Sequence, residues 1–333
     1  ALLLSQHCPQ VIASDVSPRA VHFARFNCLF NGRDHVTAVE SDLYSALQGK
    51  TFDRIVAHPP YVPSLSNAVI WRDGGATGEE PLRHIVEGLP AFLRRGGTFY
   101  ASCGGFDTIE HKFEHRIRDW LGPAHGQFDV LFAVEFDKSP WDLAVASSSR
   151  PEGDPGGQRL LKRFTEMRAQ NFAAGSLLIY RRTESESRPP VQALTQRTQL
   201  SPMTDGSCLD AYLLWWRWLS STESPAALGH LKPRLGASLR VKIDHVVVEH
   251  ELVPCSIVLE SSRPFQAETK VEPEMVQVLL RCDGETSLLE LHEIARQASW
   301  VPENLTLPDF LKFGARMIER GYLEVDASDL DAG

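Results

Sequence analysis

The first half of the chain alternates short apolar runs with longer segments in which apolar residues recur at helical spacing. The apolar runs predict strands at Val11–Ala13, Val36–Glu40, Arg54–Ala57 and Thr98–Ser102. Helices are predicted between them, from Ser17-Pro18 to about Phe30 and from Leu82 to Arg94. Strands that alternate with helices in this way predict an α/β fold built on a parallel sheet.

The alternation continues with longer elements to about residue 182. Spacing predicts a helix at Thr108–Leu121, and alternation predicts a strand at Phe128–Phe136 that Leu143–Val145 continues. A helix at Gln158–Phe172 then precedes a closing strand at Ser176–Tyr180. We expect this inserted helix to pack on the sheet, although it could also line a substrate entrance.

Residues 183–206 are polar and contain a Pro-Pro pair, which predicts a linker or an ordered crossing of the surface. A smaller α+β domain is expected over residues 207–333. Within it, Trp215 and Trp218 fall on one helical face, which favours a core position over a binding platform. Alternation also predicts a hairpin that pairs Leu239–His250 with Ser256–Glu260.

The last part of the chain, about residues 273–326, has three segments of helical spacing followed by a short apolar run. This order predicts a winged-helix-like module at the end of the C-terminal domain. Such modules often bind DNA, but the third segment sets Lys312 and Arg316 against Asp309 and Glu319 in an acidic domain. We therefore expect a module for protein contact or dimerisation.

The composition is that of an ordinary globular protein, since 43% of the 333 residues are hydrophobic and 23% are charged. No run of about 18 apolar residues occurs, so no membrane span is predicted. The six cysteines include no Cys-x-x-Cys pair, which argues against a zinc site or a disulfide framework. We expect no metal site and a location in a reducing cytoplasm.

Charge is distributed unevenly between the two halves, although the whole chain has a formal net charge of -9. Residues 1–200 hold 22 Lys and Arg against 22 Asp and Glu, whereas residues 201–333 hold 12 against 21. Tight nonspecific binding of nucleic acid depends on a basic surface. The charge distribution therefore makes a nucleic-acid partner less favoured than a protein or a small molecule.

The most informative motif is His58-Pro59-Pro60-Tyr61, which follows the predicted strand at Arg54–Ala57. The two prolines fix the backbone and remove two N–H donors, so the carbonyls of His58 and Pro59 are left to accept hydrogen bonds from another group. Tyr61 adds an aromatic face that could stack on a planar amide or base. A stiff turn with free acceptors suits a substrate that donates hydrogen bonds.

Two acidic residues follow the first two predicted strands. Asp15 lies between the strand at Val11–Ala13 and a helix, where α/β nucleotide-binding folds place a carboxylate for ribose hydroxyls. Asp42 and Leu43 follow the strand at Val36–Glu40. Alone, either acid would be interpreted as a solvated turn residue, but the repeated arrangement favours a cofactor site.

The Pro-Pro turn resembles the Asn/Asp-Pro-Pro-Tyr/Phe signature of class I S-adenosylmethionine-dependent N-methyltransferases. In the members that methylate a glutamine of peptide-chain release factors, and in their ribosomal-protein relatives, a Gly-rich segment, a helix, a Gly-Gly turn and a strand follow. The same order occurs here in Arg72-Asp73-Gly74-Gly75, Gly78-Glu79-Glu80-Pro81-Leu82, Gly96-Gly97 and Thr98–Ser102. The resemblance departs at His58, where the family usually has Asn.

The resemblance implies a Rossmann-like seven-stranded methyltransferase sheet over residues 1–182 that binds S-adenosylmethionine. It implies that Asp15 holds the ribose, that Asp42 approaches the adenine amine and that Leu43 contacts the ring. The catalytic turn would be His58, Pro59, Pro60 and Tyr61, with His58 also beside the cofactor. His58 could accept a hydrogen bond or act as a general base.

The chain lacks the Asp/Glu-x-Gly-x-Gly-x-Gly loop that follows the first strand in this family. We expect that strand and its loop to be missing from the N-terminal end of the sequence, which starts in a helical pattern. S-adenosylmethionine should then bind poorly, because such a loop lets the backbone approach the cofactor.

Several substrate classes are compatible with these residues. The resemblance around Gly74-Gly75 favours a protein glutamine amide, in a release factor or a ribosomal protein. An adenine N6 atom is one alternative acceptor, because adenine N6-methyltransferases share the Pro-Pro turn. A small molecule is another, because His58 departs from the family pattern. A third possibility is an inactive methyltransferase-like scaffold whose acidic C-terminal module binds a partner.

Overall fold

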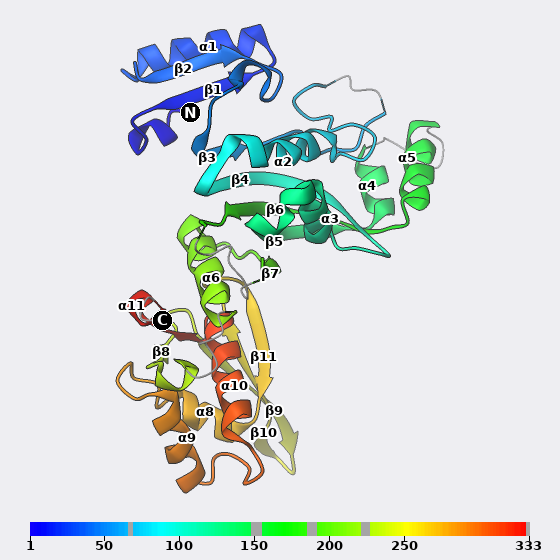
Figure 1. Cartoon of the computed structure of the whole chain (residues 1–333). Coiled ribbons are helices and arrows are strands. Elements are labelled where there is room, and N and C mark those ends of the chain that lie inside the picture. The colour runs from blue at the N-terminus through cyan, green and yellow to red at the C-terminus, as the bar shows by residue number, and fades with distance from the viewer. Residues whose placement is uncertain (66–68, 148–154, 185–191, 221–226, 331–333) are drawn as a thin grey trace.

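The computed structural model describes residues 1–65, 69–147, 155–184, 192–220 and 227–330 (Figure 1). Its N-terminal part is a mixed α/β structure, which confirms the predicted fold class. A mainly helical C-terminal part with its own small sheets lies below it in the figure.

The first two strands form a parallel pair, β1 (Val11–Asp15) and β2 (Val36–Glu40), which places Asp15 opposite Glu40. The connecting helix α1 (Pro18–Phe30) begins with proline, and Ser17 caps it by accepting a hydrogen bond from the amide of Ala20. A short 3-10 helix, η1 (Leu4–Gln6), precedes the pair. Within the described residues, neither strand pairs with any strand of the larger sheet.

The larger sheet has five strands in the order β3-β4-β6-β5-β7. Strand β4 is parallel to β3 and antiparallel to β6, which is also antiparallel to β5. Strand β7 runs parallel to β5 at the edge. The bounds are β3 (Phe52–Ala57), β4 (Leu93–Thr108), β5 (Phe128–Lys138), β6 (Ala169–Arg181) and β7 (Thr195–Gln199). The strands expected in one sheet are thus divided between two sheets.

Helices cover both faces of the five-stranded sheet. Helices α2 (Glu80–Phe92) and α3 (Phe113–Trp120) pack on one face, in a core that contains Leu89, Phe99 and Phe132. Helix α6 (Gly206–Leu219) covers the other face through Leu209, Tyr212 and Leu213. The pair α4 (Pro140–Ser147) and α5 (Pro155–Glu166) lies beyond the ends of β5 and β6, at the right in Figure 1.

The C-terminal part has its own core, in which Trp215 and Trp218 are buried. Their rings stack with centroids 5.4 Å apart, as expected for core residues. Three helices supply most of the other core side chains: α8 (Pro273–Leu279), α9 (Leu288–Gln297) and α10 (Leu307–Glu319). Short strands β8 (Arg234–Leu235) and β12 (Leu323–Glu324) pair beside them, with α11 (Ala327–Leu330) at the end. A winged-helix-like arrangement of these elements stays a prediction.

A separate antiparallel sheet in this part has the order β11-β10-β9. Its strands are β9 (Arg240–Val248), β10 (Glu251–Ser261) and β11 (Ala267–Val271). The predicted hairpin is present, with β9 slightly shorter than the expected Leu239–His250 and β10 longer than the expected Ser256–Glu260, and it extends to the lower right in Figure 1.

Three sequence-based predictions need correction. Leu143–Val145 lies in α4 and not in a strand, because Pro140 begins the helix and Ser139 accepts a hydrogen bond from the amide of Asp142. Residues 108–112 are not helical, since β4 extends to Thr108 and α3 begins at Phe113. The predicted helix at Gln158–Phe172 ends at Glu166, after which β6 begins at Ala169.

The predicted linker, residues 183–206, contains β7, which pairs with β5 through five residues. The strand is held in place by Arg197, whose guanidinium lies between the buried carboxylates of Asp107 and Glu114. Such long-range ion pairs have no signature in a polar five-residue segment. The domain boundaries themselves stay predictions.

No helix in the described ranges is both long enough and apolar enough to cross a membrane.

Candidate functional site

The turn His58–Tyr61 begins at the C-terminal end of β3. Pro59 is buried and His58 is exposed, with the rings of His58 and Tyr61 nearly parallel at 24° and 6.0 Å between centroids. Among the residues that the structure describes, none donates a hydrogen bond to the carbonyl of His58 or of Pro59. The turn therefore presents two free acceptors beside an aromatic ring, as the sequence predicts.

The Gly-rich segment folds back on this turn and holds it. The amide of Val62 donates to the carbonyl of Arg72 at 3.1 Å, and the amide of Gly74 donates to the carbonyl of Val62 at 2.9 Å. The amide of Ser64 donates to the carbonyl of Gly75 at 2.8 Å. These bonds form a short ladder that fixes where the turn points.

Glycine is required at Gly74 because the two backbones meet there. A Cβ added at Gly74 would lie 2.6 Å from the carbonyl oxygen of Pro60 and also 2.6 Å from that of Gly78. Neither contact can be relieved by rotating a side chain, because both atoms belong to the backbone. The Gly-Gly pair that the sequence resemblance singled out is thus a packing requirement of the turn.

Glu79 anchors the same segment to the sheet. Its buried carboxylate accepts hydrogen bonds from the amide of Phe106 at 2.7 Å and from both terminal nitrogens of Arg116, at 2.8 and 2.6 Å. Phe106 lies on β4 and Arg116 on α3. A bidentate pair to a buried carboxylate is strong and directional, so it fixes the start of α2 against the sheet.

Asp15 and Asp42 lie at neighbouring strand ends. The amide of Ser41 donates to the carbonyl of Asp15 at 3.0 Å, which joins the last residue of β1 to the residue directly after β2. One carboxylate oxygen of Asp15 accepts from the amide of Ser17 at 2.8 Å, and the side chain is exposed. In the described part of the chain, the other oxygen of Asp15 has no donor, and neither has the carboxylate of Asp42. Both acids can accept hydrogen bonds from a ligand.

The segment after β2 connects the two-stranded pair to the rest of the site. Leu43 adopts a left-handed backbone conformation, with φ of 48°, and packs partly against the core of the larger sheet. Tyr44 stacks on Phe92 with centroids 4.2 Å apart, and its hydroxyl donates to the carbonyl of Ile85 at 3.1 Å. Burial raises the pKa of the Tyr44 hydroxyl. This contact attaches β1 and β2 to α2 although no strand joins the two sheets.

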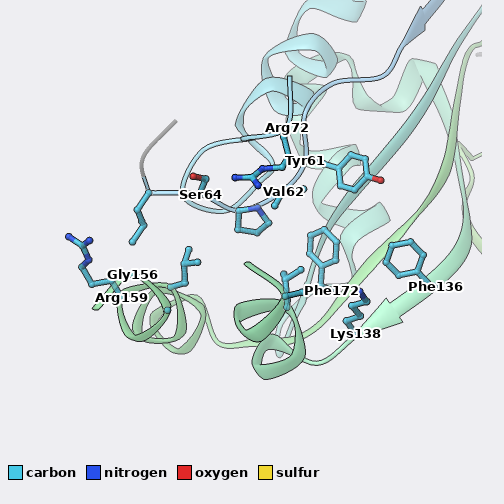
Figure 2. Close-up of a pocket in the computed structure, with 15 residues that line it drawn as sticks. Tyr61, Val62, Ser64, Arg72, Phe136, Lys138, Gly156, Arg159 and Phe172 are labelled. Carbon is cyan, nitrogen blue, oxygen red and sulfur yellow. The ribbon is translucent and has the colours of Figure 1, made fainter. Parts of the chain in front are cut away.

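A cavity of about 520 Å³ opens beside Tyr61 (Figure 2). In the figure, Tyr61, Phe136 and Phe172 lie on one side of it and Arg159 lies on the opposite side. Most of the other lining is apolar: Val62, Pro63, Leu65, Leu143, Ala146 and Leu160. The described lining includes basic side chains but no acidic one.

The inserted helices both pack and line this cavity. Leu160 of α5 and Leu143 of α4 are buried against Phe172, and they also face the cavity. The predicted packing role is thus observed, and a role at a substrate entrance stays a prediction. Phe136, Lys138 and Phe172 were not predicted as site residues, because the sequence pattern only places Phe136 in a strand and Phe172 in a helix, and the fold brings all three to the cavity beside Tyr61.

Within the described residues, no group of three or more His, Cys, Asp and Glu side chains could hold a metal ion.

Comparison with known families matches residues 1–114 to the family described as Methyltransferase small domain. The release factor glutamine methyltransferase of Xylella fastidiosa is 38% identical over 98 residues, which cover 26% of this chain and 36% of that protein. A putative protein N5-glutamine methyltransferase of Methanocaldococcus jannaschii is 34% identical, over 26% of this chain and 47% of that protein. The release factor glutamine methyltransferase of Moorella thermoacetica is 32% identical, over 31% of this chain and 41% of that protein. The chain therefore spans between about a third and a half of the length of these curated relatives.

Similarity to solved structures is weak. Trm5b of Pyrococcus abyssi matches 54% of this chain and 40% of its own length, at 17% identity and a TM-score of 0.30. A geranyl diphosphate methyltransferase in complex with SAM matches 55% of this chain and 73% of its own length, at 12% identity and a TM-score of 0.30.

The N-terminal part of the chain thus resembles class I S-adenosylmethionine-dependent methyltransferases, and the release factor glutamine methyltransferases among them. This confirms the predicted resemblance, and S-adenosylmethionine is the methyl donor of the enzymes that the chain resembles. The roles of individual site residues stay predictions.

Proposed function

We propose that this protein transfers a methyl group from S-adenosylmethionine to a nitrogen atom held at the turn His58–Tyr61, and that the nitrogen belongs to a protein glutamine amide. The observation that carries the proposal is the turn itself. Two backbone carbonyls that accept no hydrogen bond from the described residues lie beside an aromatic ring, and that ring borders a cavity large enough for an acceptor side chain.

The residues at the strand ends fit the cofactor. Asp15 and Asp42 lie at neighbouring strand ends and have carboxylate oxygens that no described residue donates to, so Asp15 would accept two ribose hydroxyls and Asp42 a hydrogen bond from the adenine amine. The methyl group is supplied as the carbon of a sulfonium ion, which is electrophilic without a metal. Asp15 and Asp42 then need only bind the cofactor and orient its methyl group.

The turn would prepare the acceptor nitrogen. The lone pair of an amide nitrogen is delocalised into its carbonyl, so the N–H groups must be held in a geometry that makes the lone pair available. The carbonyl of Pro59 would accept one N–H and His58 the other, while Tyr61 covers the amide plane. The N–CH₃ bond forms as the S–CH₃ bond breaks, and the nitrogen then loses a proton, to His58 or to water.

A protein glutamine is favoured over other acceptors for two reasons. The curated relatives that match the N-terminal part are named as release factor or protein glutamine methyltransferases. The Gly-rich segment that supports the turn is also the segment on which the resemblance depends. Release factors and ribosomal proteins are therefore the first acceptors to test.

The experiment is a label-transfer assay with methyl-tritiated S-adenosylmethionine and the purified release factor of the source organism. We expect label in the release factor, and none when its accepting glutamine is replaced by alanine. A set of ribosomal proteins, adenine-containing oligonucleotides and a small-molecule extract form the other arms. Label in an oligonucleotide or small molecule alone would replace the glutamine proposal with that acceptor class.

An inactive methyltransferase-like scaffold that binds a partner through its acidic C-terminal part is the second candidate, since residues 201–333 hold 12 Lys and Arg against 21 Asp and Glu. Equilibrium dialysis separates the two functions, because it detects weak binding that a kinetic assay misses. If S-adenosylmethionine is not retained at millimolar concentration, the scaffold function is preferred.

A further inference from the structure

The hairpin of β9 and β10 carries apolar side chains that the rest of the chain leaves uncovered. Seven of them are between 40% and 71% exposed: Val241, Ile243, Val246, Val247, Val248, Leu252 and Val253. The hairpin turns through Glu249 and His250, both with positive φ, and projects away from the C-terminal core (Figure 1). An apolar surface of this kind on a projecting element marks an interaction site.

One face of the hairpin continues the C-terminal core into solvent. Val241 lies opposite Leu259, which is fully buried, and Ile243 lies opposite Ile257. Farther out, Val247 and Leu252 face each other and are 70% and 71% exposed. The apolar stripe therefore begins in the core and loses its cover toward the tip.

Strand β9 is also an open edge. Among the described residues, β10 is the strand that pairs with it, so the other side of β9 has no strand partner over nine residues, and the carbonyl of Ile243 lies 3.2 Å from Nδ1 of His245 on the same strand. Natural proteins cover or charge such edges, because a long apolar edge recruits another strand. Strand β9 combines the two features of a strand-pairing site: an edge without a strand partner and exposed apolar side chains.

We propose that β9 pairs antiparallel with β9 of a second copy of this chain, with Ile243 on the two-fold axis. In antiparallel pairing about Ile243, residues whose numbers differ from 243 by equal and opposite amounts face each other. Lys242 then lies opposite Asp244 of the second copy, and the same pair repeats on the other side of the axis. Val241 lies opposite His245 of the second copy.

Charge complementarity selects this register. Pairing about Asp244 would place two aspartates directly opposite each other, and like charges in that position are destabilising. Pairing about Ile243 instead gives two opposite-charge pairs around an apolar centre, and it keeps the apolar stripes of both copies on one face. Lys242 already pairs with Glu260 on β10, so it would bridge its own strand and the second copy.

The pairing joins the two three-stranded sheets into one sheet of six. It is isologous, since the same strand is used by both copies, so assembly stops at a dimer. The occupant of this edge is therefore a second copy, and a different protein partner is the competing outcome.

The first test is the mass of the full chain by light scattering or sedimentation. The chain has a mass of 37.1 kDa, and we expect a dimer at micromolar concentration. Ile243→Lys puts two like charges on the axis and should yield a monomer with unchanged circular dichroism. Val145→Lys is the matched control, since Val145 is 41% exposed on α4, and it should leave the dimer intact.

The second test is disulfide trapping, in a Cys255→Ser background because Cys255 is exposed. Ile243→Cys should cross-link to itself on oxidation, because Cα atoms of directly opposed residues are about 4.5–5.5 Å apart. Val241→Cys and His245→Cys should each fail alone but cross-link when the two variants are mixed. A monomeric wild type, a dimer that survives Ile243→Lys, or cross-links in another pattern would each overturn the proposal.

Discussion

His58 is the residue at which the resemblance and the sequence disagree most directly. If His58 is a general base, His58→Asn should lower the methyl-transfer rate about 10²-fold, and the wild-type rate should rise with pH through the range in which imidazoles titrate. If His58 is only a hydrogen-bond acceptor, Asn should preserve or raise the rate. The His58→Asn variant keeps Pro59 and Tyr61, so the comparison isolates the role of the side chain at position 58.

A pH-rate profile of wild type beside His58→Asn distinguishes the two roles. Equal rates with flat profiles near neutrality would show that His58 takes no part in the chemistry.

Asp15 has both a structural and a proposed cofactor role, and these can be separated. Asp15→Asn keeps an oxygen that can accept from the amide of Ser17, but it loses the charge that would hold the ribose. We expect cofactor affinity to fall by about tenfold or more, as for loss of a hydrogen bond to a charged group, with little change in stability.

Equilibrium dialysis measures this change even if the wild type binds weakly. The exposed Asp34→Asn serves as the control for net charge. Equal affinity of Asp15→Asn and wild type would remove Asp15 from the cofactor site.

Gly74 tests whether the Gly-rich segment positions the turn. In Gly74→Ala the added carbon would meet the carbonyls of Pro60 and Gly78, so the turn must shift. A displacement of this kind should cost about 10²-fold in methyl transfer. Gly126→Ala is the control, because a Cβ there meets nothing within 4 Å, and its activity should equal that of the wild type. An unimpaired Gly74→Ala variant would show that the turn does not need this support.

At the scale of elements, features that adjoin an apolar run in the sequence could be predicted, whereas features that depend on contacts between distant segments could not. The turn at His58 and the acids after β1 and β2 are contiguous with apolar runs, so the sequence places them at strand ends. Strand β7 is polar and short, and it joins the sheet through its pairing with β5 and through the ion pairs of Arg197 with Asp107 and Glu114, which lie far away in the sequence. The cavity could not be predicted either, since its lining comes from β5, β6, α4 and α5 as well as from the turn.

The ion-pair cluster at β7 leads to a prediction about stability. Arg197→Met would leave the buried carboxylates of Asp107 and Glu114 without their shared partner, which should cost about 3 kcal/mol of unfolding free energy. Arg83→Met breaks an exposed pair on α2 and should cost less than about 1 kcal/mol. Urea unfolding of both variants at pH 7 provides the comparison, and equal losses would show that Arg197 does not stabilise β7.

The same cluster predicts how stability depends on pH. Burial alone would raise the pKa of Asp107, but hydrogen bonds from Arg197 and from the amide of Phe113 outweigh it and hold that pKa below 3.8. A carboxylate with a lowered pKa stabilises the fold above its unfolded value and loses that contribution as pH falls through its folded value. The difference in unfolding free energy between wild type and Arg197→Met should therefore narrow below about pH 4.

At the scale of the whole molecule, the N-terminal and C-terminal parts have different proposed tasks. The turn, the acids and the cavity belong to the N-terminal part, and the open strand β9 belongs to the C-terminal part. The proposed dimer therefore joins two copies at a distance in sequence from the residues proposed for chemistry. Ile243→Lys should abolish the dimer and leave cofactor affinity unchanged.

The central claim is that the turn at His58–Tyr61 presents a glutamine nitrogen to S-adenosylmethionine. Transfer of the tritiated methyl group to the release factor, followed by mass spectrometry of its peptides, tests this claim most directly. The account predicts one added methyl group on the side-chain nitrogen of a glutamine, with transfer greatly reduced in Asp15→Asn and Gly74→Ala. Absence of label from every acceptor arm, or transfer that both variants support at the wild-type rate, would contradict it.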